Sequence, residues 1–223
     1  RAVVTLADGQ QIVLEQANRK IEESDGTVLH SDSGALVYTA NAEKTVAKVM
    51  YNKVSIPRGG EYRLELADGT KVWLNAATEL RFPVNFTGDM REVYLKGEAY
   101  FQVKRDEKHP FIVHTSMGAV EVLGTSFNVR DYEDEREVVT TLETGKVMYV
   151  SGNTREKVTL NPGYQVLEKE SSPVEVRKVD PLQYTGWREG KYVFEDVALE
   201  DIMRTLCRWY DIDVVYANPA VKK

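Results

Sequence analysis

Apolar and polar residues alternate with a period of two along most of this chain, up to about Val179. The run RLEL, from Arg63 to Leu66, is one example. This period places every second side chain on the same face of an extended strand, so it predicts half-buried β-strands. Turn residues interrupt the pattern about every 8 to 15 positions, which is typical of antiparallel all-β folds. We therefore expect a mainly β protein, built as an antiparallel multi-strand sandwich or as a short solenoid-like roll. The sequence does not decide between these two.

The sequence LADG occurs twice, from Leu6 and from Leu66, and an alternating run follows each copy. The apolar residues of both strands in a hairpin must share one face, and a two-residue loop at Asp68-Gly69 would break this rule. We therefore predict a three-residue loop with Gly69 in the left-handed region, where a side chain would cost about 1 to 2 kcal/mol.

The same rule predicts which residues face each other in the two hairpins. The predicted pairs are Leu66 with Val72 and Leu64 with Leu74 in the second hairpin, and Val4 with Leu14 and Leu6 with Ile12 in the first. All four apolar residues of the second hairpin should share one buried face. We expect Asp8 and Asp68 to form turns by accepting hydrogen bonds from nearby backbone amides. Neither has a second titratable group close in sequence that would support catalysis.

After Val179 the apolar residues change to the spacing of an amphipathic helix. They are Leu199, Ile202, Met203, Leu206 and Tyr210. We expect a short strand before this helix at Tyr192–Phe194 and another after it at Ile212–Tyr216. The pattern indicates a small, truncated α+β lobe. Its length of about 32 residues is below the roughly 40 that usually suffice for independent folding.

We expect four units along the chain. Residues 1–55 should form an N-terminal β segment with the first Asp-Gly hairpin, and residues 56–180 should form the main β domain. We expect residues 181–190 to be a linker and residues 191–223 to be the first half of a C-terminal β-α-β domain.

Charge and composition exclude several classes of partner. The net charge is -6, and no dense Lys/Arg cluster offers a basic face, so we expect no nucleic-acid partner. The apolar runs are far shorter than the roughly 20 residues of a membrane-spanning helix. Cys207 is the only cysteine, so no disulfide forms within the chain.

The sequence offers no positive reason to propose an enzyme, a cofactor or a metal site. His109 and His114, on one extended strand, would point to opposite faces about 16 Å apart. The acidic run DYEDERE, Asp131 to Glu137, lacks the glycine of a calcium-binding EF-hand loop. We expect that run to be a solvated, self-repelling loop. A glycoside hydrolase would require two carboxylates about 5 to 9.5 Å apart in a cleft, and the sequence singles out no such pair.

Four aromatic residues leave one alternative function open. Trp73, Tyr94, Tyr100 and Tyr149 could form an exposed platform in a carbohydrate-binding β module. In a sheet protein such residues more often pack in the core or across strands, and this alternative requires Trp73 or Tyr94 to be exposed to solvent.

Several stretches together resemble one family, the FecR-type anti-sigma regulators, in the version common in Bacteroidetes. They are IPRGGEYRLELADGTKVWLNAATELRFPVNF (Ile56 to Phe86), REVYLKGEAYFQVKRDEKHPFIVHT (Arg91 to Thr115), VEVLGTSFNVRDY (Val120 to Tyr132) and TTLETGKVMYVSG (Thr140 to Gly152). The later stretch YVFEDVALEDIMRTLCRWYDIDVVY resembles the start of the family's C-terminal domain, which is similar to the short N-terminal domain of secretins and TonB-dependent receptors.

The resemblance implies a function that the residues alone do not. The chain is then the periplasmic part of a single-pass inner-membrane protein that senses a TonB-dependent outer-membrane transporter by binding its N-terminal signalling domain. The resemblance also implies that an extracytoplasmic-function sigma factor binds a cytoplasmic segment, and that this segment and the membrane helix lie outside the present chain. We expect the partner to bind at a sheet edge formed by Ile212, Asp213, Val214, Val215 and Tyr216.

Overall fold

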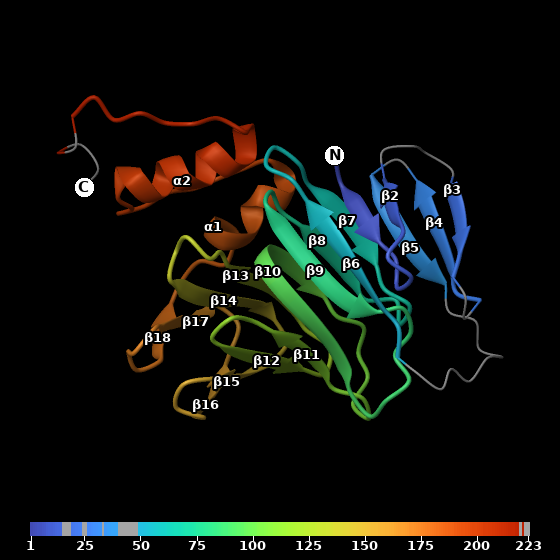
Figure 1. The fold of residues 1–223 in the computed structure, drawn as a ribbon. Coiled ribbons are helices and arrows are strands. Elements are labelled where there is room, and N and C mark those ends of the chain that lie inside the picture. The colour runs from blue at the N-terminus through green and yellow to red at the C-terminus, as the bar shows by residue number, and fades with distance from the viewer. Residues whose placement is uncertain (15–18, 24–25, 33, 40–48, 219, 221–223) are drawn as a thin grey trace.

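The computed structural model describes residues 1–14, 19–23, 26–32, 34–39, 49–218 and 220, and it is mainly β (Figure 1). Parts of the predicted units 1–55 and 191–223 therefore lie outside the described residues. The strands are β1 (Val3–Thr5), β2 (Gln11–Val13), β3 (Arg19–Glu22), β4 (Val28–Asp32), β5 (Ala35–Thr39), β6 (Tyr51–Ile56), β7 (Tyr62–Glu65), β8 (Lys71–Leu74), β9 (Thr78–Pro83), β10 (Arg91–Gln102), β11 (Phe111–His114), β12 (Gly118–Val122), β13 (Ser126–Asp131), β14 (Glu137–Thr144), β15 (Val147–Ser151), β16 (Lys157–Leu160), β17 (Tyr164–Lys169) and β18 (Glu175–Lys178). The helices are α1 (Leu182–Thr185), the 3₁₀ helix η1 (Gly186–Glu189) and α2 (Leu199–Tyr210).

The strands form two long sheets that share one strand. Sheet A has the order β2-β1-β6-β9-β10-β11-β12-β15-β16. Sheet B has the order β3-β4-β5-β7-β8-β10-β13-β14-β17-β18. Neighbouring strands are antiparallel except β5 with β7 and β10 with β11, which are parallel. The mainly β prediction is confirmed, with these two pairs as departures from a fully antiparallel pattern.

Strand β10 crosses from sheet A to sheet B at Gly97. Its first half pairs with β9 and β11, and its second half pairs with β8 and β13. Gly97 has φ +105°, and a Cβ at this position would lie 2.5 Å from Thr78 Oγ1 and 2.7 Å from Thr78 Cα. Only glycine fits this backbone and this close approach, so Gly97 permits one strand to serve both sheets.

The core lies between the two sheets, which are joined through β10 into one curled, sandwich-like mixed sheet, called the sandwich below. Aromatic rings meet across it, with ring centroids 5.1 Å apart for Tyr38 and Phe82 and 6.1 Å apart for Phe101 and Phe111. Each fully buried side chain of this size contributes about 1.5 to 3 kcal/mol through removal of apolar surface from water.

Both Asp-Gly hairpins have the predicted three-residue loop, but their register differs from the prediction. The second loop comprises residues 67–69 and is closed by the hydrogen bond from the Leu66 amide to the Thr70 carbonyl. Leu64 therefore pairs with Val72, and the first hairpin shows the same shift by pairing Val4 with Ile12. The predicted pairs were wrong by two residues, because moving the loop by one position shifts the register by two and keeps the same face buried.

The other predictions about these hairpins are confirmed. Leu64, Leu66, Val72 and Leu74 are all buried on the core face. Gly69 has φ +85° and Gly9 has φ +90°, both in the positive-φ region. Asp68 Oδ1 accepts a hydrogen bond from the Thr70 amide at 2.9 Å, and Asp8 Oδ1 accepts one from the Gln10 amide at 2.8 Å. Both aspartates thus shape turns.

The C-terminal region differs from its prediction in two ways. The expected linker, residues 181–190, forms α1 and η1 and buries Trp187 against the sandwich. Helix α2 forms as predicted, but Tyr192–Phe194 and Ile212–Tyr216 are not strands. A strand requires a neighbour for its ladder hydrogen bonds, and the described part of the chain supplies none at either place.

Candidate functional site

Helix α2 docks on the sandwich through its polar side. Thr205 and Arg208 are its buried residues, and both face the sandwich. Leu199 and Tyr210 lie about half a turn around the helix from them and are 39% and 64% exposed. Ile202, Met203 and Leu206, the other three residues of the predicted apolar stripe, are partly buried, so the stripe is exposed at its two ends and not along its whole length.

Arg208 forms the main contact between α2 and the sandwich. Its Nη1 atom lies 3.0 Å from each carboxylate oxygen of Asp134, and its Nη2 atom donates to Glu135 Oε1. The guanidinium carbon also lies 3.8 Å from the ring centroid of Tyr132, which is a close cation–π contact. One α2 residue is thus held by three residues of the loop that follows β13.

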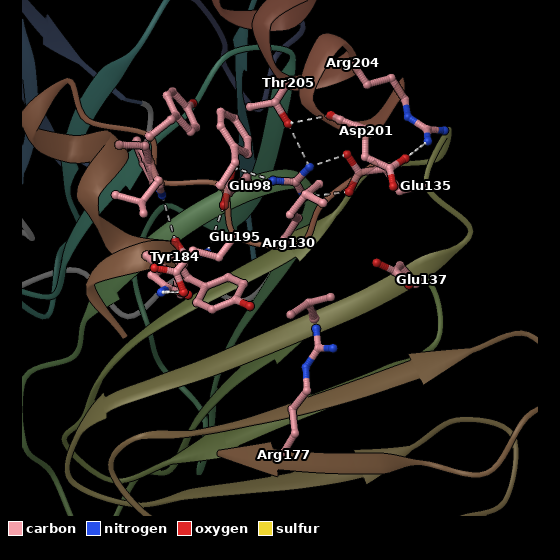
Figure 2. Close-up of a pocket in the computed structure, with 18 residues that line it drawn as sticks. Glu98, Arg130, Glu135, Glu137, Arg177, Tyr184, Glu195, Asp201, Arg204 and Thr205 are labelled. Carbon is pink, nitrogen blue, oxygen red and sulfur yellow. Dashed lines mark hydrogen bonds and ion pairs between the residues drawn. The ribbon is translucent and has the colours of Figure 1, made fainter. Parts of the chain in front are cut away.

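Arg130, at the end of β13, shares the carboxylate of Glu135 with Arg208. Its Nε and Nη2 atoms donate to Glu135 at 2.6 Å each, and Nη2 also lies 3.2 Å from Thr205 Oγ1 (Figure 2). Burial alone would lower the pKa of Arg130, but the charges of Glu98 and Glu135 raise it above its ordinary value. Burial would raise the pKa of Glu135, yet the two arginines lower it overall. Both shifts favour the charged forms of Arg130 and Glu135.

A second polar cluster lies below this network and connects it to η1. Glu98 accepts hydrogen bonds from Asn75 Nδ2 at 2.8 Å and from Asn128 Nδ2 at 3.0 Å. Asn128 Oδ1 in turn accepts one from Trp187 Nε1 at 3.1 Å, and Asn75 Nδ2 donates to Tyr192 Oη at 3.0 Å. Burial, followed by the charge of Glu98, raises the pKa of Tyr192 to about 12. These bonds fix the segment that leads into α2 onto the outer face of sheet B.

Arg58, in the turn between β6 and β7, holds the other end of α2. Its Nε and Nη2 atoms donate to the Cys207 carbonyl at 3.3 and 3.1 Å, and Nη2 also donates to the Ile212 carbonyl. Its Nη1 atom lies 3.1 Å from Asp213 Oδ1. The last carbonyls of a helix have no partner within the helix, so a cation at this position satisfies them and complements the helix dipole.

A cleft of about 280 Å³ opens between the C-terminal segment and the outer face of sheet B (Figure 2). Arg130, Glu98 and Trp187 are among the residues that line it, and Arg177, Glu137 and Glu195 also contribute to its walls. The arginines and carboxylates at its α2 end bond to each other, which suits a docking junction better than a catalytic centre. Among the described residues, no group of three or more His, Cys, Asp or Glu side chains is placed to hold a metal ion. Nor does any helix in the described part of the chain have the length and apolar character needed to cross a membrane.

Comparison with known proteins identifies the two parts that meet at this junction. The family model "FecR protein" matches residues 52–148, and the model "FecR, C-terminal" matches residues 191–223. A crystal structure of a protein described as an anti-sigma factor from Parabacteroides distasonis ATCC 8503 is 32% identical, with a TM-score of 0.70. The similarity covers 76% of this chain and 82% of that one.

The chain belongs to the FecR family of anti-sigma factors. A second crystal structure of a protein so described, from the same organism, is 34% identical with a TM-score of 0.68, and the similarity covers 71% of this chain and 74% of that one. No curated protein matches the chain. The resemblance drawn from the sequence is thus confirmed, including its Bacteroidetes-like character.

The acidic run of this FecR protein forms the predicted loop between two strands, with Glu133 and Arg136 exposed, but the prediction that the run is solvated is wrong for Asp131 and Glu135. Glu135 is buried between two arginines, and Asp131 is buried and accepts hydrogen bonds from Ser116, with burial raising the pKa of Asp131. The negative charges of this run would repel each other if the run stood alone, but in the structure Arg130 and Arg208 pair with them. Arg208 lies 74 residues away from its partner Asp134. Nothing in the local sequence predicts this pairing, although the arginines spaced along the polar side of α2 were a visible sign.

The aromatic residues of the carbohydrate alternative do not gather on one surface of the FecR sandwich. Tyr149 is fully buried in the core, and Tyr100 is buried beneath Arg188, whose guanidinium carbon lies 3.5 Å from the ring centroid. Trp73 contacts Tyr100 on the outer face of sheet B. Tyr94 lies on the outer face of sheet A and is 36% exposed. A platform built from all four is excluded.

The histidines and the predicted contact segment also have definite positions. His109 Nδ1 lies 2.8 Å from Asp106 Oδ2, and His114 Nε2 lies 3.0 Å from Glu92 Oε1. The hydrogen bond from His109 lowers the pKa of Asp106 to about 2. The segment Ile212–Tyr216 leaves the end of α2 that Arg58 holds, so it begins at the docking junction.

Proposed function

We propose that this chain is the periplasmic sensor portion of a membrane-anchored anti-sigma factor. It relays the state of a TonB-dependent outer-membrane transporter to an extracytoplasmic-function sigma factor by protein–protein contact. The sensor binds the N-terminal signalling domain of the transporter, and the sigma factor binds a cytoplasmic segment of the same anti-sigma factor. Membership of the FecR family supports the regulatory part of this proposal.

The observation that carries the proposal is the orientation of α2. A helix that only stabilised the sandwich would bury its apolar side, because apolar burial is the main favourable term in folding. Here Thr205 and Arg208 dock, while the apolar stripe is exposed at Leu199 and Tyr210 and only partly buried between them. Ile212 and Val215, just beyond the helix, are 44% and 93% exposed. Uncovered apolar groups of this kind are typical of surfaces that bind another protein.

The proposed contact comprises five consecutive residues of the C-terminal segment. They are Ile212, Asp213, Val214, Val215 and Tyr216. The segment is not part of a sheet, so an incoming strand of the signalling domain can pair with its backbone. Arg58 already bonds to Ile212 and Asp213. Binding there therefore acts directly on the contact that holds α2 to the sandwich.

Polar docking gives the relay a state that a partner can change. Moving a two-state equilibrium from 1:99 to 99:1 requires a difference in binding free energy of about 5.5 kcal/mol. A few charged hydrogen bonds, each worth about 1.5 to 3 kcal/mol, have the same scale. Partner binding at the C-terminal segment can therefore shift α2 between docked and released positions.

Calorimetry with the purified signalling domain of the cognate transporter tests the contact. We expect Val215→Asp to weaken binding by at least about tenfold, because it places a charge in an apolar contact. Val176→Asp is the control. Val176 is an exposed valine like Val215, with 44% of its surface accessible, but it lies on β18 at the edge of sheet B, away from the proposed contact. If the wild-type protein shows no association at high micromolar concentration, or if both variants bind equally well, this contact is wrong.

A further inference from the structure

The outer face of sheet A has a row of planar side chains that the proposed function does not use. The row runs across four adjacent strands as Tyr51 (β6), Arg81 (β9), Tyr94 (β10) and His114 (β11). The Arg81 guanidinium carbon lies 4.0 Å from the ring centroid of Tyr51 and 5.1 Å from that of Tyr94. The rings of Tyr94 and His114 stack with centroids 4.7 Å apart. We call these four residues the stacked row.

The stacked row presents its tips to solvent. The ring faces of Tyr94 are taken by Arg81 on one side and His114 on the other. What remains available on this surface is the phenol hydroxyls and the N–H groups of the guanidinium. Strands about 4.8 Å apart make the row about 14 Å long. It is therefore an extended line of hydrogen-bonding groups.

A hollow of about 330 Å³ adjoins the stacked row, and most of the charged residues that line it are basic. Its lining includes three cations, Lys53, Arg81 and Lys96, and one carboxylate, Glu79. That carboxylate lies 3.1 Å from Lys53 Nζ and accepts a hydrogen bond from Ser55 Oγ at 3.2 Å.

Two of these cations have no ion-pair partner among the described residues. Within the described ranges neither Arg81 nor Lys96 forms an ion pair, although Lys96 acts through space on Asp131, which is itself bonded to Ser116. Two cations that lack an ion pair in the described part of the chain create a local positive potential beside the hollow, which favours an anion there.

The position of the face determines which kind of anion fits. The strands β6, β9, β10 and β11 all have neighbours on both sides, so their backbone ladder groups are already used. A peptide cannot add to this face as a strand, and recognition must come from side chains. Thr115 and Ser116, which also line the hollow, already donate their hydroxyl protons to the Gly118 carbonyl and to Asp131, so these hydroxyls and Glu79 can accept hydrogen bonds from ligand hydroxyls.

We propose that the stacked row and its hollow bind an acidic oligosaccharide, with Arg81 and Lys96 contacting its carboxylate or sulfate groups and the tyrosine hydroxyls contacting its ring hydroxyls. This ligand has the required length, charge and density of hydroxyl groups. The inference does not depend on the transporter relay, because the stacked row is on sheet A and α2 docks on sheet B.

Titration of the purified chain with an oligogalacturonate, followed by NMR or calorimetry, tests this site. A neutral oligosaccharide of equal length and a polyglutamate of equal charge separate sugar recognition from simple charge attraction, and a sulfated oligosaccharide separates the two kinds of acidic group. We expect saturable binding of at least one acidic oligosaccharide, with chemical shift changes at Tyr94 and His114.

Substitutions then test the assigned residues. Arg81→Gln and, separately, Lys96→Gln should each weaken binding at least about tenfold. The matched control is Arg63→Gln, because Arg63 is also an exposed arginine over an aromatic ring, 5.3 Å from the centroid of Trp73, but lies on the outer face of sheet B. Lys96→Gln leaves the stacked row intact, so it stays informative if Arg81→Gln disturbs the face. Absence of binding to both acidic saccharides at millimolar concentration, equal binding of polyglutamate, or unchanged binding by both variants would overturn the proposal.

Discussion

Replacing Arg208 by methionine should release α2 from the sandwich while leaving the sandwich folded. Methionine keeps most of the apolar stem and removes the guanidinium. The bond to Glu135 is charged on both sides and nearly buried, so its loss costs about 1.5 to 3 kcal/mol. The contact with Asp134 adds less than about 1 kcal/mol, because that carboxylate is 55% exposed. The cation–π contact with Tyr132 adds about 0.5 to 2 kcal/mol.

The expected total is about 3 kcal/mol or more, which corresponds to roughly a 150-fold change in the docking equilibrium. Hydrogen exchange measured by mass spectrometry reads this out, because peptides from α2 and from β10 report on different opening events. We expect exchange in α2 to accelerate by about that factor while exchange in β10 stays unchanged. Arg204→Met is the control, because Arg204 bonds mainly to Asp201 of its own helix and to one backbone carbonyl, so its effect should be below about 1 kcal/mol. Unchanged protection of α2, or equal loss in α2 and β10, would refute the reasoning.

Two further predictions concern pH and the crossover strand. The pKa of Glu135 is lowered in the folded state, so its stabilising effect is fully present above its ordinary value of 4.5 and is lost as pH falls through the lower folded value. Protection of α2 should therefore fall selectively in acid, and Glu135→Gln should remove this pH dependence. Gly97→Ala should destabilise the whole sandwich by several kcal/mol in thermal unfolding, because the new Cβ would overlap the neighbouring strand. Gly9→Ala, with nothing within 4 Å of its Cβ, should cost only about 1 to 2 kcal/mol, and equal costs for the two variants would contradict the crossover argument.

The sequence predicted those features of the fold that depend on local periodicity. The alternation around Leu64 predicted both the strands and their buried face, because burial requires one face to be apolar. The register was wrong by two residues because a loop of residues 67–69 and one of residues 68–70 bury the same face. The last loop position, occupied by Gly69 with a positive φ, is the feature that selects between them.

The candidate site could not be predicted in the same way, because its contacts join distant parts of the chain. Arg208 and Glu135 are 73 residues apart, and the acidic run around Glu135 appears self-repelling when read alone. Likewise, Trp187 lies in a stretch that looked like a linker, and only its bond to Asn128 explains a buried tryptophan there. The spacing of Leu199 and Tyr210 predicted the helix correctly, but spacing cannot tell which side of a helix docks.

The relay itself is tested most directly by sigma-dependent transcription in cells that contain the full-length anti-sigma factor and its transporter. The measurement compares a reporter gene with the intact transporter and with a transporter that lacks only its N-terminal signalling domain, with substrate uptake measured in parallel. The proposal predicts that induction is lost in the truncated strain while uptake continues. Induction that persists without the signalling domain would contradict it.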